Sequence, residues 1–463
     1  MPVTGTTPRT TAGAPPRPRL TLVVLLAAQF MLAVDFSILN VALPVIGEGL
    51  GLTLSGLQWI ATAFALCAAG FTLLFGRIAD LFGRRRLFLG GLAVLAAASL
   101  AGGLASTPEV LIAARVFQGL ATAAVTPAGL SLLTTSFPEG PLRRRALGLN
   151  GALMSAGFTT GAILGGVLTE LLSWRWAFLV NVPVALAVLL VAPAILRESR
   201  ETGRPSALDV PGAVTVTLAL LSLTFGLTRA GDHGWGSATA LVPLLAGGAL
   251  LLLFHAVERR VATPLVPPAV LARRTVAWGN VAGLTAFLTE TSLVFLLTLY
   301  LQDVLGFSPL AAGLTFGVLG LGTVLGGAAA PRIAGRVGTR ATLLTGGLVQ
   351  TAATVALLGL GDDRAWLWLL LPATFVGGVG NMLAIVAFMI TATSGLPDHE
   401  QGLATGLATM TQQIGITMGT PVMAALATGA PLVLDGIRTA ITANAALALL
   451  GTAMSALFLR PER

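Results

Sequence analysis

Three ionisable side chains lie deep inside long apolar runs of this 463-residue sequence: Asp35, Arg115 and Glu290. An ionised carboxylate is costly in an apolar environment, so the binding and release of a proton can serve as a switch at such a position. An arginine stays charged and needs a carboxylate or other acceptors around it. These residue types therefore predict a site that handles protons together with a charged group.

Asp35 and Arg115 are expected at a similar depth in their helices. Asp35 lies 15 residues after Leu20, where its apolar run begins, which is about 22 Å along a helix at roughly 1.5 Å per residue. Arg115 lies five residues into a run of opposite direction, so it also lies about 22 Å from the first face of a core roughly 30 Å thick. Two interpretations are open, a structural ion pair and a proton-coupling pair.

Glu290 is the repeat partner of Asp35, because 290 − 35 = 255. The same offset separates the basic segment GRIADLFGRRRL, which begins at Gly76, from PRIAGRVGTRAT, which begins at Pro331. Duplicated halves of this kind build many secondary transporters. Two carboxylates related in this way would face one central cavity from opposite halves, one carrying the proton and the other meeting a cationic or zwitterionic substrate. A protonated, purely structural Glu290 is the alternative.

The elements that position these residues are transmembrane helices. The chain is 55% hydrophobic and 10% charged, with a mean hydropathy of +0.89, and apolar runs of membrane-spanning length recur throughout. We expect an all-α polytopic membrane protein with about 14 helices, arranged as two pseudo-symmetric six-helix bundles and an inserted pair. The predicted parts are a disordered cytoplasmic tail (1–19), an N-terminal bundle (20–200), a linker with two inserted helices (201–260), a C-terminal bundle (261–459) and a short cytoplasmic tail (460–463).

The net charge of +8 comes entirely from arginine, and its placement argues against nucleic-acid binding. With the N-terminus inside, 22 arginines fall on one side of the predicted membrane and four on the other. By the positive-inside rule this bias places both termini in the cytoplasm, in a multi-pass protein of the cell membrane.

Other kinds of site find little support. One cysteine (Cys67) and three scattered histidines argue against a metal site. A polytopic membrane enzyme would need clustered acidic ligands or a nucleophile and base, and the loops offer only Asp362-Asp363 and Asp398–Glu400. No cleavable signal precedes the first apolar run. We therefore expect a monomeric non-enzyme without a cofactor.

Four motifs in order resemble those of the major facilitator superfamily, specifically its fourteen-helix drug:proton antiporters. They are DFSILNVALP (Asp35–Pro44), GRIADLFGRRR (from Gly76), RVFQGLATA (Arg115–Ala123) and WRWAFLVNVPV (Trp174–Val184). The fifth-helix antiporter motif retains its glycines, but Ala162 replaces its proline. The resemblance implies the major facilitator fold and export of an amphipathic drug or antibiotic, driven by the proton gradient. A proton-coupled or facilitative importer of a small metabolite remains the alternative.

Site residues are predicted in four groups. The coupling residues are Asp35, Glu290 and Arg115. The expected substrate cavity comprises Asn40, Gln118, Phe287, Glu290, Met382 and Gln412. A cytoplasmic latch is expected at Gly76, Asp80, Gly83, Arg84 and Arg85, and close helix packing at Gly157, Gly161, Gly165 and Gly166.

Overall fold

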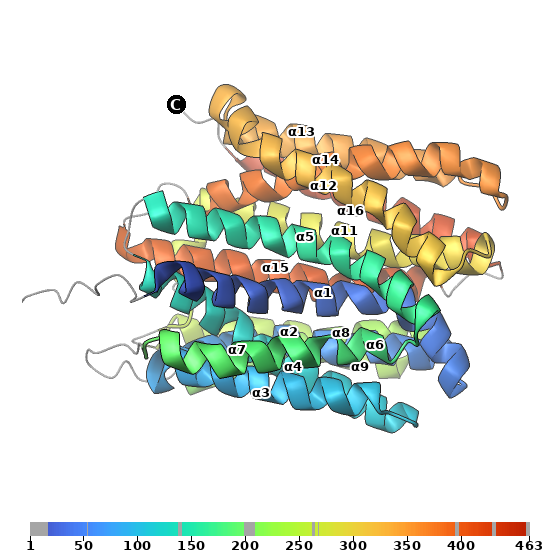
Figure 1. The fold of residues 1–463 in the computed structure, drawn as a ribbon. Coiled ribbons are helices and arrows are strands. Elements are labelled where there is room, and N and C mark those ends of the chain that lie inside the picture. The colour runs from blue at the N-terminus through green and yellow to red at the C-terminus, as the bar shows by residue number, and fades with distance from the viewer. Residues whose placement is uncertain are drawn as a thin grey trace, which may run out of the picture.

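The computed structural model describes residues 17–52, 54–137, 141–198, 209–261, 264–266, 268–393, 398–427 and 432–459. All regular structure in these ranges is helical. The long helices lie roughly side by side, and α1 (Pro18–Leu50) begins at the same end of the bundle as the chain ends (Figure 1). The helix includes Pro18 and Arg19, which the sequence assigned to a disordered tail, and residues 1–16 of that tail lie outside the described residues.

The N-terminal half continues with α2 to α7, which are Leu54–Phe82, Arg84–Gly103, Pro108–Ser136, Pro141–Leu171, Trp176–Leu179 and Asn181–Ile195. The next two helices are α8 (Val210–His233) and α9 (Ala238–Glu258). The remaining elements are α10 (Pro268–Leu271), α11 (Arg274–Leu299), η1 (Tyr300–Val304), α12 (Pro309–Val337), α13 (Thr339–Ala356), η2 (Leu357–Gly359), η3 (Arg364–Trp366), α14 (Leu367–Thr393), α15 (Asp398–Ala427) and α16 (Val433–Phe458).

The helix boundaries repeat with the offset seen in the sequence. Helix α12 begins 309 − 54 = 255 residues after α2 begins, and ends 337 − 82 = 255 residues after α2 ends. The turns that follow these two helices are equivalent as well, since Gly83 and Gly338 both have positive φ angles, of 114° and 88°. Glycine takes that conformation without a steric penalty. The chain is therefore a structural duplication.

Eleven helices in the described part of the chain are long and apolar enough to cross a membrane. Helices α2, α5 and α15 fall outside that set, although each has 29 to 31 residues, enough for a hydrocarbon core of roughly 30 Å. The fold is thus a polytopic helical one, and the total of 14 spans stays a prediction.

Each half has its own packed interior, and the halves meet along two helix pairs. Helix α1 packs on α5, α2 on α4 and α3 on α4, while α11 packs on α15 and both α12 and α13 pack on α14. Figure 1 shows α3 and α4 on one side, α13 and α14 on the other, and α1 and α15 between them. Contacts between the halves run through α5 with α12 and α15 with α2. Helix α8 lies against both α2 and α15, and α9 packs on α8.

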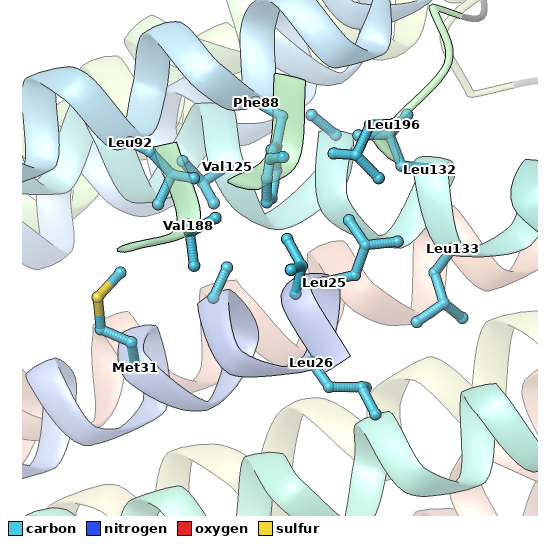
Figure 2. Close-up of a cluster of buried hydrophobic side chains, with 14 of the residues drawn as sticks. Leu25, Leu26, Met31, Phe88, Leu92, Val125, Leu132, Leu133, Val188 and Leu196 are labelled. Atoms are coloured by element: carbon cyan, nitrogen blue, oxygen red, sulfur yellow. The ribbon is translucent and has the colours of Figure 1, made fainter. Parts of the chain in front are cut away.

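A buried apolar cluster holds α1, α3, α4 and α7 together (Figure 2). Leu25 and Phe88 are completely buried there, as are Leu92 and Val125. Packing of this kind, rather than removal from water, drives helix association in lipid. The cluster fixes the helices that carry Asp35 and Arg115.

Candidate functional site

The structure brings Asp35 and Arg115 together. Asp35 of α1 is completely buried and Arg115 of α4 is only 2% exposed. Arg115 Nη1 lies 3.5 Å from Asp35 Oδ2 in an ion pair. The shared depth deduced from the two apolar runs therefore corresponds to a real contact.

Two amide side chains hold the other oxygen of Asp35. Gln118 Nε2 donates to Asp35 Oδ1 at 3.3 Å, and Asn181 of α7 donates to the same atom. Both amides also donate to Ser99 Oγ of α3, at 2.8 and 3.4 Å. Among the described residues Asp35 Oδ2 has no hydrogen-bond partner, and its interaction there is the ion pair with the guanidinium. Oδ1 is fixed, and Oδ2 is the oxygen left to exchange its partner.

The guanidinium of Arg115 has its own set of partners. Arg115 Nε donates to the Ile60 carbonyl at 3.2 Å, and Nη1 donates to Gln118 Oε1 at 2.9 Å. The guanidinium lies 4.0 Å from the ring centroid of Phe64, in a cation–π contact. Arg115 and Phe64 also line a cavity closed on its other side by Ile416, Thr420 and Pro421 of α15. Arg115 thus lies between the buried carboxylate and the interface of the two halves.

Glu290 of α11 occupies a different setting. It is half-buried, because it lines two cavities. One cavity lies inside the C-terminal half, and the other opens between the halves, where Phe158 and Thr159 of α5 face Phe316 of α12. Asn381 of α14 lines the first of these cavities together with Glu290. In the described ranges no ion pair reaches Glu290, in contrast to Asp35.

The other residues of the predicted cavity are dispersed. Gln118 belongs to the Asp35 network. Phe287 and Met382 lie in an apolar cluster of the C-terminal half, where the Phe287 ring is 6.4 Å from that of Phe388. Gln412 is half-buried on α15. The side chain of Asn40 lies outside the described residues.

The turn between α2 and α3 docks on the end of α7. Glu198 accepts hydrogen bonds from the backbone N–H groups of Arg85 and Arg86, at 3.0 and 3.3 Å. The Arg85 guanidinium donates to the Pro193 carbonyl at 2.7 Å. A side chain at Gly83 would collide with the Glu198 carboxylate. Glu198 is the latch residue that the sequence analysis missed; its only signal was an acid directly after an apolar run, in a segment with several arginines.

Of the other predicted latch residues, Gly76 lies near Pro127, and Arg84 is half-buried at the first position of α3. The side chain of Asp80 lies outside the described residues.

The glycines of α5 lie at close helix crossings. A side chain at Gly157, Gly161 or Gly165 would collide with the backbone of α1, and one at Gly166 would collide with Pro309 of α12. Ala162 is buried in the same interface, where its carbonyl faces Gly313. Small residues permit such approaches in membranes.

Two hydrogen bonds join the halves at the end of the bundle opposite the chain termini. Glu170 Oε2 at the end of α5 accepts from the N–H of Leu310 at 3.0 Å. Gln302 Nε2 donates to the Val41 carbonyl at 3.0 Å. This end of the interface is closed.

Comparison with known proteins identifies related chains. The family model described as Major Facilitator Superfamily matches residues 25–420. The chain is 40% identical over 412 residues to a cephamycin export protein of Amycolatopsis lactamdurans, covering 87% of this chain and 83% of that protein. It is also 40% identical over 424 residues to a puromycin resistance protein of Streptomyces alboniger, covering 90% and 83%.

Among solved structures, the human organic anion transporter MFSD10 has the same fold. The TM-score is 0.63 at 19% identity, and the match covers 95% of this chain and 100% of that one.

Proposed function

The chain belongs to the major facilitator superfamily, and we propose that it exports an antibiotic or similar amphipathic drug across the cytoplasmic membrane in exchange for protons. The names of the relatives at 40% identity, one a cephamycin exporter and one a puromycin resistance protein, support the substrate class. The buried ion pair of Asp35 and Arg115 supports the coupling. Both chain termini are assigned to the cytoplasm, from the arginine distribution.

The observation that carries the proposal is the unequal environment of the two Asp35 oxygens. Oδ1 accepts from Gln118 and Asn181, whereas Arg115 is the one partner of Oδ2 in the described part of the chain. A proton on Oδ2 would neutralise the carboxyl without breaking the hydrogen bonds that the Gln118 and Asn181 side chains donate to Oδ1. It would also release the guanidinium from its counter-charge, and a buried charge without a partner is strongly destabilising.

Release of Arg115 would act at the interface between the halves. Its guanidinium already lines the cavity that α15 also lines, so a shift of Arg115 would change the shape of that cavity between the halves. Proton binding on Asp35 is thereby linked to the relative position of the two halves. Alternating access by rocking of such halves around a central site is the general mechanism of these folds.

Glu290 is the second acid of the proposed mechanism and meets the substrate. It lines the cavity between the halves beside Phe158 and Phe316, so a carboxylate and two aromatic rings meet in one place. That combination suits a cationic or zwitterionic amphipathic molecule, whose apolar body contacts the rings.

The closed end of the interface is the proposed gate, and the docked turn is proposed to support the N-terminal half. Glu170 and Gln302 hold the halves together at the end opposite the termini, which is the extracellular end under the proposed topology. Glu198 joins the α2–α3 turn to α7 at the cytoplasmic end. An exporter needs the first contact to open and close in each cycle, while the second keeps its own half rigid.

The test is drug susceptibility of an efflux-deficient bacterial host with and without the gene, paired with transport into inverted membrane vesicles. We expect raised resistance to at least one antibiotic, and uptake into acidified vesicles that stops when a protonophore collapses the gradient. Uptake that does not depend on the proton gradient would overturn the proposed exchange of drug for protons. Accumulation of drug in intact cells would favour an importer.

A further inference from the structure

We infer that the cavity beside Glu290 binds a protonated amine of the substrate, next to the acid that corresponds to Asp35 of the N-terminal half. The inference rests on the proposed export function and names the group that the C-terminal half recognises. It follows from a residue-by-residue comparison of the two halves, which the common offset of 255 residues permits.

The acid is kept in both halves, but the groups that hold it are not. Arg115, Gln118 and Asn181 surround Asp35. Their counterparts 255 residues later are Leu370, Ala373 and Gly436. None of these three side chains carries a donor. The hydroxyl position alone persists, since Ser99 corresponds to Thr354.

A cavity lies beside the counterparts of Gln118 and Ser99, whereas Leu370 and Gly436 do not line it. Ala373 and Thr354 line it together with Glu290, Gln350 and Asn381. Its free space is about that of one water molecule. An ammonium group has a similar size, whereas a planar aromatic cation does not fit there.

The polar groups of the cavity match an ammonium donor. Glu290 supplies the negative charge. Asn381 is 3% exposed, and its amide oxygen and nitrogen make no hydrogen bond within the described residues. One N–H of the Gln350 amide donates to Thr289 Oγ1 at 2.8 Å. One carboxylate and one amide oxygen can accept two of the three N–H bonds of an ammonium group.

An ammonium fits better than a guanidinium for a second reason. In the N-terminal half the Arg115 guanidinium stacks on Phe64. The counterpart of Phe64 is Leu319, which lines both Glu290 cavities. Without an aromatic face, the site lacks the stacking partner that favours a planar cation, and it suits a compact point charge.

The rest of the substrate has a place between the halves. Glu290, Val294 and Leu319 line both cavities, so a molecule with its amine beside Asn381 can extend past Glu290 toward Phe158. The C-terminal half would thus bind the charged amine, and the cavity between the halves would hold the apolar part of the substrate.

A lysine introduced by mutation into the cavity tests whether the site binds an amine, and this test does not require the substrate to be known. Ala373→Lys places an ammonium in the cavity, and Ala373→Met is the matched uncharged control. We expect the lysine variant of the purified protein to unfold at a higher temperature than the methionine variant when Glu290 is present, and at a lower temperature in the Glu290→Gln background. Equal differences in the two backgrounds would overturn the inference, because the carboxyl would then not recognise the amine.

Direct binding supplies the second test, with doxorubicin, which carries one primary amine, and its neutral N-acetyl derivative as probes. Equilibrium dialysis with the purified protein should give about tenfold tighter binding of the amine, a difference of about 1.4 kcal/mol, and Glu290→Gln should abolish this preference. No preference in the wild type, including no binding of either probe, would overturn the inference. Neither readout requires transport, so a failure here is distinct from a failure of the export assay.

Discussion

Arg115 Nη1 lies 3.5 Å from Asp35 Oδ2, and the two side chains are 2% and 0% exposed. An ion pair this deeply buried contributes little net stability, because desolvation of both charges offsets their attraction. Its persistence in an apolar bundle is better explained by a function that uses the pair in two states. The predictions below follow from that relationship and from the different setting of Glu290.

Removing one partner of the pair should destabilise the protein more than removing both. Arg115→Ala leaves the Asp35 carboxylate buried without its cation, at a cost of about 3–5 kcal/mol. Thermal unfolding of the purified protein in detergent should therefore show a large drop for Arg115→Ala and a smaller one for Arg115→Ala with Asp35→Asn. Strictly additive effects of the two changes would argue against a direct interaction.

Glu290→Gln should separate cationic from neutral substrates. The amide still offers hydrogen bonds to a neutral drug but no longer balances a positive charge in a low-dielectric cavity. Uptake into inverted vesicles should fall about tenfold or more for doxorubicin, which carries a protonated amine, and far less for chloramphenicol, provided that the wild type exports both. An equal loss of both would reassign Glu290 to proton coupling, and no loss of either would make it structural.

The glycines of α5 should tolerate no side chain. Gly165→Val forces a collision with the Ile38 carbonyl of α1, and overpacking of this kind costs about 1–3 kcal/mol. The matched control is Gly90→Val on α3, where a side chain meets nothing. Membrane yield and thermal stability should drop for Gly165→Val alone; similar values for the two variants would contradict the close crossing.

The docking of Glu198 should matter for transport. Glu198→Ala removes the acceptor of two backbone N–H groups at the start of α3, and each such bond is worth about 1 kcal/mol. Glu109 provides the control, because it is an exposed acid in the first turn of α4. We expect Glu198→Ala to reduce drug resistance although the amount of protein in the membrane is unchanged. Glu109→Ala should leave drug resistance at the wild-type value. Normal resistance in both would show that the α2–α3 turn works without this contact.

Part of the site was accessible from sequence because helices convert residue counts into depth. Counting from the ends of two apolar runs places Asp35 and Arg115 at one level, and a shared motif gives the offset that relates Asp35 to Glu290. The boundaries of α2 and α12 follow the same offset without deviation. Because the rise per residue in a helix is constant, residue counts predict the depth of a side chain along the helix axis.

The lateral neighbours were not accessible in this way. Asn181 reaches Asp35 from α7, and Ser99 of α3 accepts a hydrogen bond from Asn181. Glu198 contacts the α2–α3 turn from 112 or more residues away. Sequence fixes the depth of a residue but not which helices stand beside it. The apolar residues were the hardest to assign, because lipid, helix interfaces and cavities are lined by the same side chains. Phe287 and Met382 accordingly lie in an apolar cluster rather than on either Glu290 cavity.

The central claim is that Asp35 carries the coupled proton. The most direct measurement is drug uptake into inverted vesicles containing wild-type or Asp35→Asn protein, at equal protein amounts and with an imposed pH gradient. The substitution keeps the shape of the side chain and removes only its capacity to ionise. We predict that Asp35→Asn abolishes gradient-driven accumulation while the protein remains folded and still equilibrates drug down its own concentration gradient. Undiminished gradient-driven accumulation by Asp35→Asn would contradict the account.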